Sequence, residues 1–207
     1  MTIRLHRFAL SGHAHRAELM LSLLGLPFES VDVDLPGGAH KTPAFLAMNP
    51  FGQVPVIEDG AATIADSNAI LVYLATRYDP SGRWLPRDAL GAAAVQRWLS
   101  VAAGELVNGP SLARIEVLFQ RPRDPQRHRQ AARLFELMEA HLAGQEWLAG
   151  GAPTIADIAL YTYTAHAPEG GVSLQPYPKL RQWLVRIEAL PGFVGMRRSP
   201  DAPALSA

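Results

Sequence analysis

The chain has 207 residues, and its 19 basic and 19 acidic side chains leave no formal net charge. A chain of this length buries roughly 70% of its unfolded surface, so one or two domains can fold without a metal or a disulfide. Zero net charge gives nucleic acid or an anionic membrane no overall electrostatic attraction, so we expect neither as a partner. Because the sequence has no cysteine, disulfides and a C-x-x-C redox pair are excluded, and any thiol chemistry must use a ligand's thiol.

The first eighty residues predict alternating strands and helices. TIRLHRF alternates apolar and polar residues without an apolar signal core, so it predicts a first strand and, by default, a cytoplasmic protein. Apolar runs such as LMLSLLGL are too short to span a bilayer. The expected order is β-α-β-α-β-β-α, with strands near Ile3–Leu5 and at 28–35, 54–57 and 62–65, and helices from about His13, at 43–48 and at 67–78. Ligands of such α/β sheets usually bind beyond the strand ends, where loops meet helix N-termini.

Pro55 lies inside the apolar run Val54–Ile57. Proline has no N–H for the sheet ladder, so Pro55 must lie at the entrance or edge of a strand. A cis Val54–Pro55 bond meets this constraint, and it would expose the N–H and C=O of Val54 to an extended peptide ligand. Asp66 and Ser67, which open the next helix, would bind the far end of that ligand.

Residues 80–88 are rich in turn formers and predict a linker between a first domain, residues 1–79, and a second, residues 89–207. After the linker only helical patterns follow, at 89–119, 125–143, 155–166 and 179–190, so the second domain should be all helical. Thr154 and Asp157 have the spacing of a capping box. We therefore interpret Asp157 as a structural residue that stabilises a helix start and not as a catalyst.

The order and spacing of several motifs resemble a soluble, bacterial-type glutathione S-transferase over essentially the whole chain. These motifs are LSLLGLPFE, NPFGQVPVIEDG, DSNAILVYL and TIAD. The resemblance implies a thioredoxin-like N-terminal domain that binds glutathione and an all-helical C-terminal domain that shapes the pocket for an electrophile. It also implies a homodimer that needs no metal.

The resemblance implies roles for individual residues at the glutathione site. Val54 would pair its backbone with the cysteinyl part of glutathione, and Asp66 and Ser67 would hold the γ-glutamyl end, with Ser67 and the helix N-terminus receiving the carboxylate. An ordinary helix cap is the alternative for this pair. Lys41 matches a position that meets the glycyl carboxylate, although an exposed lysine is usually only a solvated charge. Gln53 and, more weakly, His40 belong to the same pattern.

Ser11 is the catalytic candidate. It lies between the first strand and the first helix, where serine-type members of the family carry the hydroxyl that meets the glutathione sulfur. A free thiol has a pKa near ~8.5, so a hydrogen bond that favours the thiolate activates it at neutral pH. Ser11 could instead simply cap the helix. His13 and His15 follow closely, and a histidine beside the thiol could also tune it.

We therefore expect an enzyme that conjugates the glutathione thiolate to a small hydrophobic electrophile, with hydroperoxide reduction as a side activity. The isomerase branch of the family, which acts on maleylacetoacetate, carries a serine-serine-cysteine run where this chain has Ser11, Gly12 and His13. That difference argues against isomerisation. The rival hypothesis is a non-catalytic carrier or docking domain, because fold alone does not decide function.

Overall fold

The computed structural model describes residues 2–199, which divide into two compact units. The first unit runs to Gly82 and includes the later segment Leu190–Arg197, and the second runs from Arg83 to Ala189. The sequence-based division had assigned this segment to the second domain. It belongs to the first unit because His15 Nε2 lies 2.9 Å from the carbonyl oxygen of Val194 and the Ser22 hydroxyl donates to that of Gly192 over 2.6 Å.

The first unit contains a four-stranded mixed sheet with helices. Along the chain its elements are β1 (Ile3–Arg7), α1 (Gly12–Leu23), β2 (Phe28–Asp32), the short 3-10 helix η1 (Ala39–Lys41), α2 (Pro43–Met48), β3 (Val56–Asp59), β4 (Ala62–Ala65) and α3 (Ser67–Tyr78). The strand order is β2-β1-β3-β4, with β1 parallel to β2 and antiparallel to β3, and β3 antiparallel to β4. The thioredoxin-like fold expected for the N-terminal domain is confirmed.

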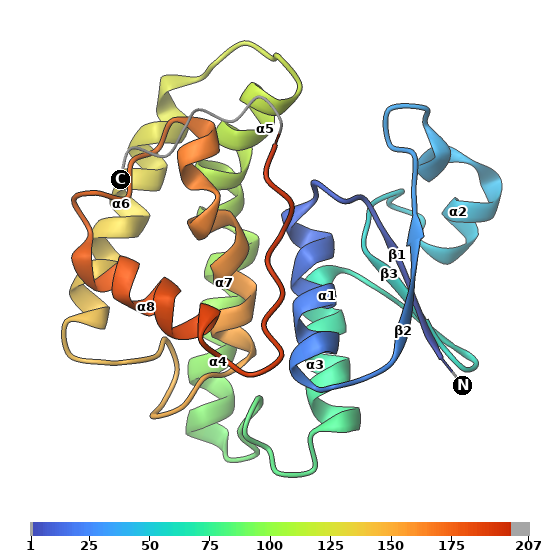
Figure 1. Cartoon of the computed structure of the whole chain (residues 1–207), viewed down its shortest axis with the longest axis horizontal. Helices are drawn as coiled ribbons and strands as arrows, with labels where there is room; N and C mark the ends of the chain where they lie inside the picture. The colour runs from blue at the N-terminus through green and yellow to red at the C-terminus, as the bar shows by residue number, and fades with distance from the viewer. Residues whose placement is uncertain (1, 200–207) are drawn as a thin grey trace. The chain divides into compact units, whose positions relative to one another are not determined.

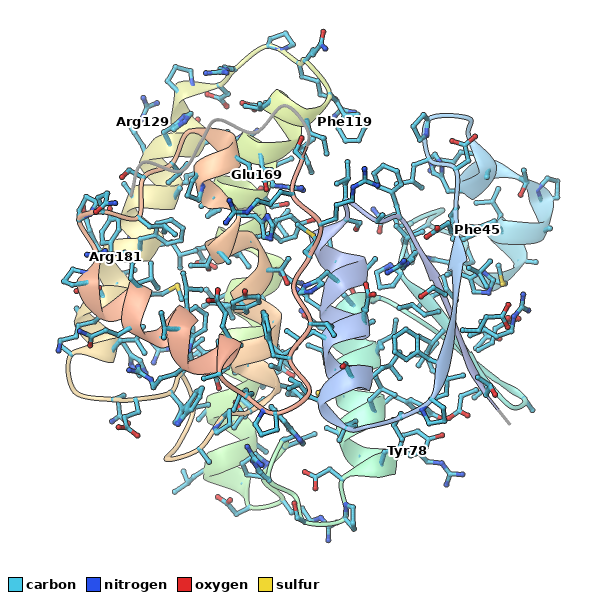
Figure 2. The ribbon with its side chains drawn as sticks, in the orientation of Figure 1. Phe45, Tyr78, Phe119, Arg129, Glu169 and Arg181 are labelled. Carbon is cyan, nitrogen blue, oxygen red and sulfur yellow. The ribbon has the colours of Figure 1, made fainter. Side chains whose placement is uncertain are left out.

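Helices cover both faces of this sheet. Figure 1 shows α1 and α3 side by side on one face, while α2 lies on the other. Phe45 of α2 is buried against Val33 and Val56, and its side chain can be followed in Figure 2. The sheet is therefore fixed from both sides, and the loops at its ends are held in place.

Two predicted strands differ from the observed ones. β3 begins at Val56, so Val54 and Pro55 precede the strand and do not form part of it. The missing N–H of Pro55 accounts for this start. β2 ends at Asp32 and not at Leu35, although the N–H of Val33 still donates to the carbonyl of Arg7 over 2.7 Å.

The described residues of the second unit form helices joined by loops, without a strand. Its elements are α4 (Ala89–Ala103), a π-helical turn η2 (Val107–Ser111), α5 (Leu112–Leu118), α6 (Pro125–Leu142), α7 (Ile155–Ala165), the 3-10 helix η3 (Ala167–Gly170) and α8 (Pro178–Glu188). The helical pattern expected over 89–119 is divided into α4, η2 and α5: α4 ends at Ala103, and Pro110 lies inside the π-helical turn, where it cannot donate an α-helical hydrogen bond. Gly109 also comes so close to α6 that a Cβ there would lie 2.8 Å from the backbone nitrogen of Ala131. The all-helical C-terminal domain is confirmed.

A buried ion pair lies inside this helical unit. Arg114 Nε donates to Glu169 over 2.7 Å, and His166 Nδ1 lies 2.7 Å from the other oxygen of the same carboxylate. Burial by itself would raise the pKa of Glu169, but the contacts with His166 and Arg114 lower it overall. Figure 2 shows Glu169 in the interior of the unit. Within residues 2–199, no helix is both long and apolar enough to cross a membrane.

Candidate functional site

The loops that carry the predicted site residues meet at one end of the sheet. Arg7, near the end of β1, pairs with Asp32 at the end of β2. Val56, the first residue of β3, pairs with His6 on one side and with Ala65, the last residue of β4, on the other. The last residues of β1, β2 and β4 and the first residues of β3 therefore lie at the same end of the sheet. The adjoining loops carry Ser11, His40, Lys41, Gln53, Val54, Asp66 and Ser67.

Ser11 caps helix α1. Its N–H donates to the carbonyl of Phe8 over 2.9 Å, which closes the turn after β1, and its hydroxyl accepts a hydrogen bond from the N–H of Ala14 over 3.2 Å. The capping role is thus real, but it uses only a lone pair of the oxygen. The hydroxyl hydrogen can still be donated to a ligand. Capping and thiolate stabilisation are therefore compatible at this residue.

The Val54–Pro55 bond is cis, the isomer expected from the sequence. The preceding loop is held by Asn49, a buried residue whose role the sequence analysis missed. Its side-chain nitrogen donates to the carbonyl of Gln53 over 2.8 Å, and its side-chain oxygen accepts from the N–H of Phe51 over 3.1 Å. The backbone of Gln53 is thereby fixed next to Val54, while the Gln53 side chain stays exposed.

Lys41 lies against this same loop. Its ammonium donates to the carbonyl oxygens of Gly52 and Phe51 over 3.3 Å and 3.5 Å. Gly52 has a φ of 60°, and a Cβ there would lie 2.8 Å from both the His40 carbonyl oxygen and Lys41 Nζ. Glycine is therefore required for the close approach of the Lys41 side chain to the backbone of this loop.

Asp66 caps helix α3 from a strained backbone. One carboxylate oxygen accepts hydrogen bonds of 2.9 Å from the N–H groups of Asn68 and Ala69. An N-cap residue normally has extended dihedral angles, as Ser11 and Thr154 do here, but Asp66 has φ 74° and ψ 129°. Such a conformation costs about 1–3 kcal/mol and occurs mostly at functional sites. Capping alone does not account for it.

Ser67 belongs to a cluster that joins the N-termini of α1 and α3. Ser67 is buried, and its hydroxyl oxygen lies 3.2 Å from Arg16 Nη1 and 3.2 Å from His13 Nδ1. Arg16 Nη1 also lies 3.1 Å from His13 Nδ1. Arg16 was not among the residues predicted from the sequence, because one arginine in an apolar helix gives no periodic signal.

Electrostatically, this end of the sheet suits a peptide with charges at both ends. The N-terminus of α3, the buried Arg16 guanidinium and Lys41 favour anionic groups, whereas the exposed Asp66 carboxylate favours a cation. Burial, with the nearby charge of Arg16, lowers the pKa of His13 to about 3, so this ring is neutral at physiological pH. Among residues 2–199, no cluster of three or more histidine or acidic side chains is placed to hold a metal ion.

Thr154 and Asp157 belong to the second unit, whereas these loops belong to the first. The Thr154 hydroxyl accepts from the N–H of Ala156 over 3.3 Å, and the Asp157 carboxylate accepts from the N–H of Thr154 over 2.9 Å. The predicted capping box is thus present, and its contacts are those of a structural element.

Known proteins match both units. The family model for the glutathione S-transferase N-terminal domain matches residues 10–77, and that for the C-terminal domain matches residues 119–191. The chain is 34% identical to glutathione S-transferase 3 of Zea mays, over 99% of each protein. It is 29% identical to maleylacetoacetate isomerase of Pseudomonas aeruginosa, over 98% of this chain and 100% of that protein.

Among solved structures, the glutathione S-transferase of Pseudomonas fluorescens is 34% identical. It superimposes with a TM-score of 0.89 over 95% of this chain and 99% of that one. Two family models, a relative aligned over nearly its full length and a similar structure thus agree with one another, and the chain belongs to the glutathione S-transferase family.

Proposed function

We propose that this protein is a serine-type glutathione S-transferase that conjugates the glutathione thiolate to a small hydrophobic electrophile. The observation that carries the proposal is the meeting of Ser11, Lys41, Val54 and the pair Asp66–Ser67 at one end of the sheet. A domain that only docks a protein partner has no physical need for a hydroxyl, a cation and a carboxylate on a strained backbone at the same end of the sheet.

Each part of glutathione has a matching group in this arrangement. The γ-glutamyl carboxylate would bind at the Ser67 hydroxyl and the N-terminus of α3, and its ammonium would bind Asp66. The cysteinyl backbone would pair with Val54, which lies just outside the ladder of β3. The glycyl carboxylate would bind Lys41, with Gln53 and His40 beside it. These contacts would hold the thiol near the N-terminus of α1.

Ser11 would then activate the thiol by donating its hydroxyl hydrogen to the sulfur. Each unit by which the pKa of the bound thiol falls corresponds to about 1.4 kcal/mol of preferential binding of the thiolate. The thiolate attacks an electrophilic carbon and forms a C–S bond. A halide then leaves with its bonding electrons, or an added acceptor takes up a proton. Ser11 forms no covalent bond, so no serine-histidine-acid triad is needed.

The run Ser11-Gly12-His13 differs from the serine-serine-cysteine run of the isomerase branch, so conjugation is the reaction we propose despite the similarity to an isomerase. The thiolate can also attack a hydroperoxide oxygen, which breaks the O–O bond, releases an alcohol and leaves a glutathione sulfenic acid. A second glutathione then condenses with the sulfenic acid to form glutathione disulfide and water. Hydroperoxide reduction is therefore part of the proposal as a side activity. We also propose that the protein is a homodimer and that it acts in the cytoplasm.

The test combines calorimetry and kinetics. Glutathione should bind the intact chain and bind Ser67→Ala more weakly, whereas Ser11→Ala should still bind glutathione but lose the conjugation of a chlorodinitrobenzene. If the intact chain does not bind glutathione, the proposal is wrong and the docking-domain hypothesis replaces it. If Ser11→Ala conjugates as fast as the intact chain, the protein is not a serine-type enzyme.

A further inference from the structure

The cluster of Arg16, His13 and Ser67 determines where hydrogens lie beneath the N-terminus of α3. Arg16 is 1% exposed, and its Nη1 lies 3.1 Å from His13 Nδ1, 3.2 Å from Ser67 Oγ and 3.5 Å from Asn68 Oδ1. A guanidinium group has only donors. Nη1 carries two hydrogens, so its two nearest neighbours, His13 Nδ1 and Ser67 Oγ, must each present a lone pair to it, and Asn68 Oδ1 is the weakest contact.

This requirement fixes the state of His13. With its lone pair turned toward Arg16, Nδ1 carries no hydrogen, so the neutral ring carries its hydrogen on Nε2. The lowered pKa of His13 is consistent with this state. A neutral histidine with Nδ1 facing inward, toward Arg16 and Ser67, presents an acceptor to them and carries no charge that could attract a thiolate.

The same requirement orients Ser67. Because its oxygen accepts from Arg16, the Ser67 hydroxyl hydrogen must point elsewhere. Within reach is His13 Nδ1, at 3.2 Å from the oxygen, where the hydroxyl hydrogen shares with Arg16 the one lone pair of this nitrogen. A carboxylate arriving at the helix N-terminus offers a stronger acceptor, and the hydroxyl can rotate from the histidine to the ligand. His13 thus holds the hydroxyl in place until a carboxylate arrives.

We propose that His13 is a positioning residue for the γ-glutamyl carboxylate, acting through Arg16 and Ser67, and that it does not tune the thiol. This inference rests on the proposed function, since it assigns a role within the same glutathione site. The sequence leaves two roles open for His13. A residue that positions the carboxylate affects the affinity for glutathione, whereas a residue that tunes the thiol affects the pKa of the bound thiol.

Three substitutions of His13 distinguish these roles. His13→Asn places an amide oxygen near the position of Nδ1, His13→Gln places its amide near Nε2, and His13→Ala removes both. We expect the KM for glutathione to rise about tenfold in His13→Ala and His13→Gln, with the loss falling on KM and not on kcat, and His13→Asn to recover most of the affinity. The pKa in the pH profile of kcat/KM for the electrophile, measured at saturating glutathione, should be the same in all three.

A double-mutant cycle tests the route through Ser67. If His13 acts through Ser67, adding His13→Ala to Ser67→Ala should raise the KM for glutathione little further. If the two residues acted independently, the factors by which the single substitutions raise KM would multiply. The inference is overturned if the pKa of the profile rises by about one unit in His13→Ala with KM unchanged, or if His13→Asn is no better than His13→Gln. It is also overturned if the two single effects multiply.

The two proposals fail in different ways. An intact chain that binds no glutathione overturns the proposed function and this inference together. An intact chain that conjugates normally, with a His13→Ala variant of equal KM, overturns only the inference. Circular dichroism of each variant checks its fold, and if His13→Ala does not fold, the comparison of His13→Asn with His13→Gln decides the question.

Discussion

The indole N–H of Trp183 donates a hydrogen bond of 2.8 Å to Asp157, from α8 to the first turn of α7. Both side chains are fully buried. The same carboxylate also accepts from the N–H groups of Leu148 and Thr154 over 3.0 Å and 2.9 Å. Burial raises the pKa of Asp157, because desolvation outweighs these hydrogen bonds. One carboxylate therefore joins two helices and the loop before them.

Replacing Asp157 with alanine should lower the free energy of unfolding of the second unit by about 3 kcal/mol, because it leaves buried N–H groups without an acceptor. Thr154→Ala should cost only about 1 kcal/mol, the usual value of a helix cap. Tryptophan fluorescence in urea measures both changes, since Trp84, Trp98, Trp147 and Trp183 all lie in this unit. Equal losses in the two variants would contradict the central role of Asp157.

Asp66 both caps helix α3 and carries a negative charge. Replacing it with asparagine keeps the capping oxygen and removes the charge, so the two roles can be measured separately. Asp66→Asn keeps a side-chain oxygen for the N–H groups of Asn68 and Ala69, and asparagine tolerates a positive φ. We expect its unfolding free energy to stay within about 0.5 kcal/mol of the parent. Its affinity for glutathione should fall about fivefold to tenfold, because the partner of the ammonium is lost.

Asp66→Ala provides the matched control, since it loses both the cap and the charge. Its stability should fall by about 1–2 kcal/mol together with its affinity. Thermal unfolding and calorimetry with glutathione measure the two quantities for each variant. Unchanged glutathione affinity in Asp66→Asn would reduce Asp66 to an ordinary cap.

Periodicity predicted most of the fold. The helix at Ser67–Tyr78 and the hairpin strand at Ala62–Ala65 have the expected bounds, because a turn and a capping residue mark where they begin. The bounds of α4, η2 and α5 within 89–119 could not be predicted, because the apolar pattern continues across all three. The return of Leu190–Arg197 to the first unit could not be predicted, since it depends on contacts of His15 and Ser22 with residues about 170 positions later.

The candidate site was predicted through its backbone loops and missed in its supporting side chains. Ser11 and Ser67 were predicted as site residues because they match motif positions of the family at helix starts, and their roles stay predictions. Arg16 and Asn49 could not be predicted, because both act by orienting other groups. A buried arginine one turn into an apolar helix gives no periodic signal of its own. The partners of Asn49 are backbone atoms of a loop whose shape is set by Gly52.

Lys41 should carry most of the attraction for the glycyl carboxylate. Lys41→Met should raise the KM for glutathione about tenfold and weaken its dependence on ionic strength, because a charge pair at the surface is screened by salt. Lys179, the chain's other lysine, is exposed on α8 in the second unit and supplies the control. Lys179→Met should leave KM as it is. Glutathione should also protect Lys41, but not Lys179, from an amine-modifying reagent, and equal protection would contradict the assignment.

Acid should destabilise the first unit through His13. The pKa of this ring is about 3 in the folded protein, because of burial and the charge of Arg16, whereas an unfolded histidine titrates near roughly 6.5. Between these values the unfolded chain holds a proton that the folded chain excludes, so stability falls as pH drops below about 6.5. His13→Asn removes this titration. The stability of the parent relative to His13→Asn, from far-ultraviolet circular dichroism in urea, should therefore decline steadily from pH 7 to pH 4. A difference that stays constant over this range would mean that the His13 ring takes up its proton at the same pH in the folded and unfolded protein, and that Arg16 does not occupy its Nδ1 lone pair.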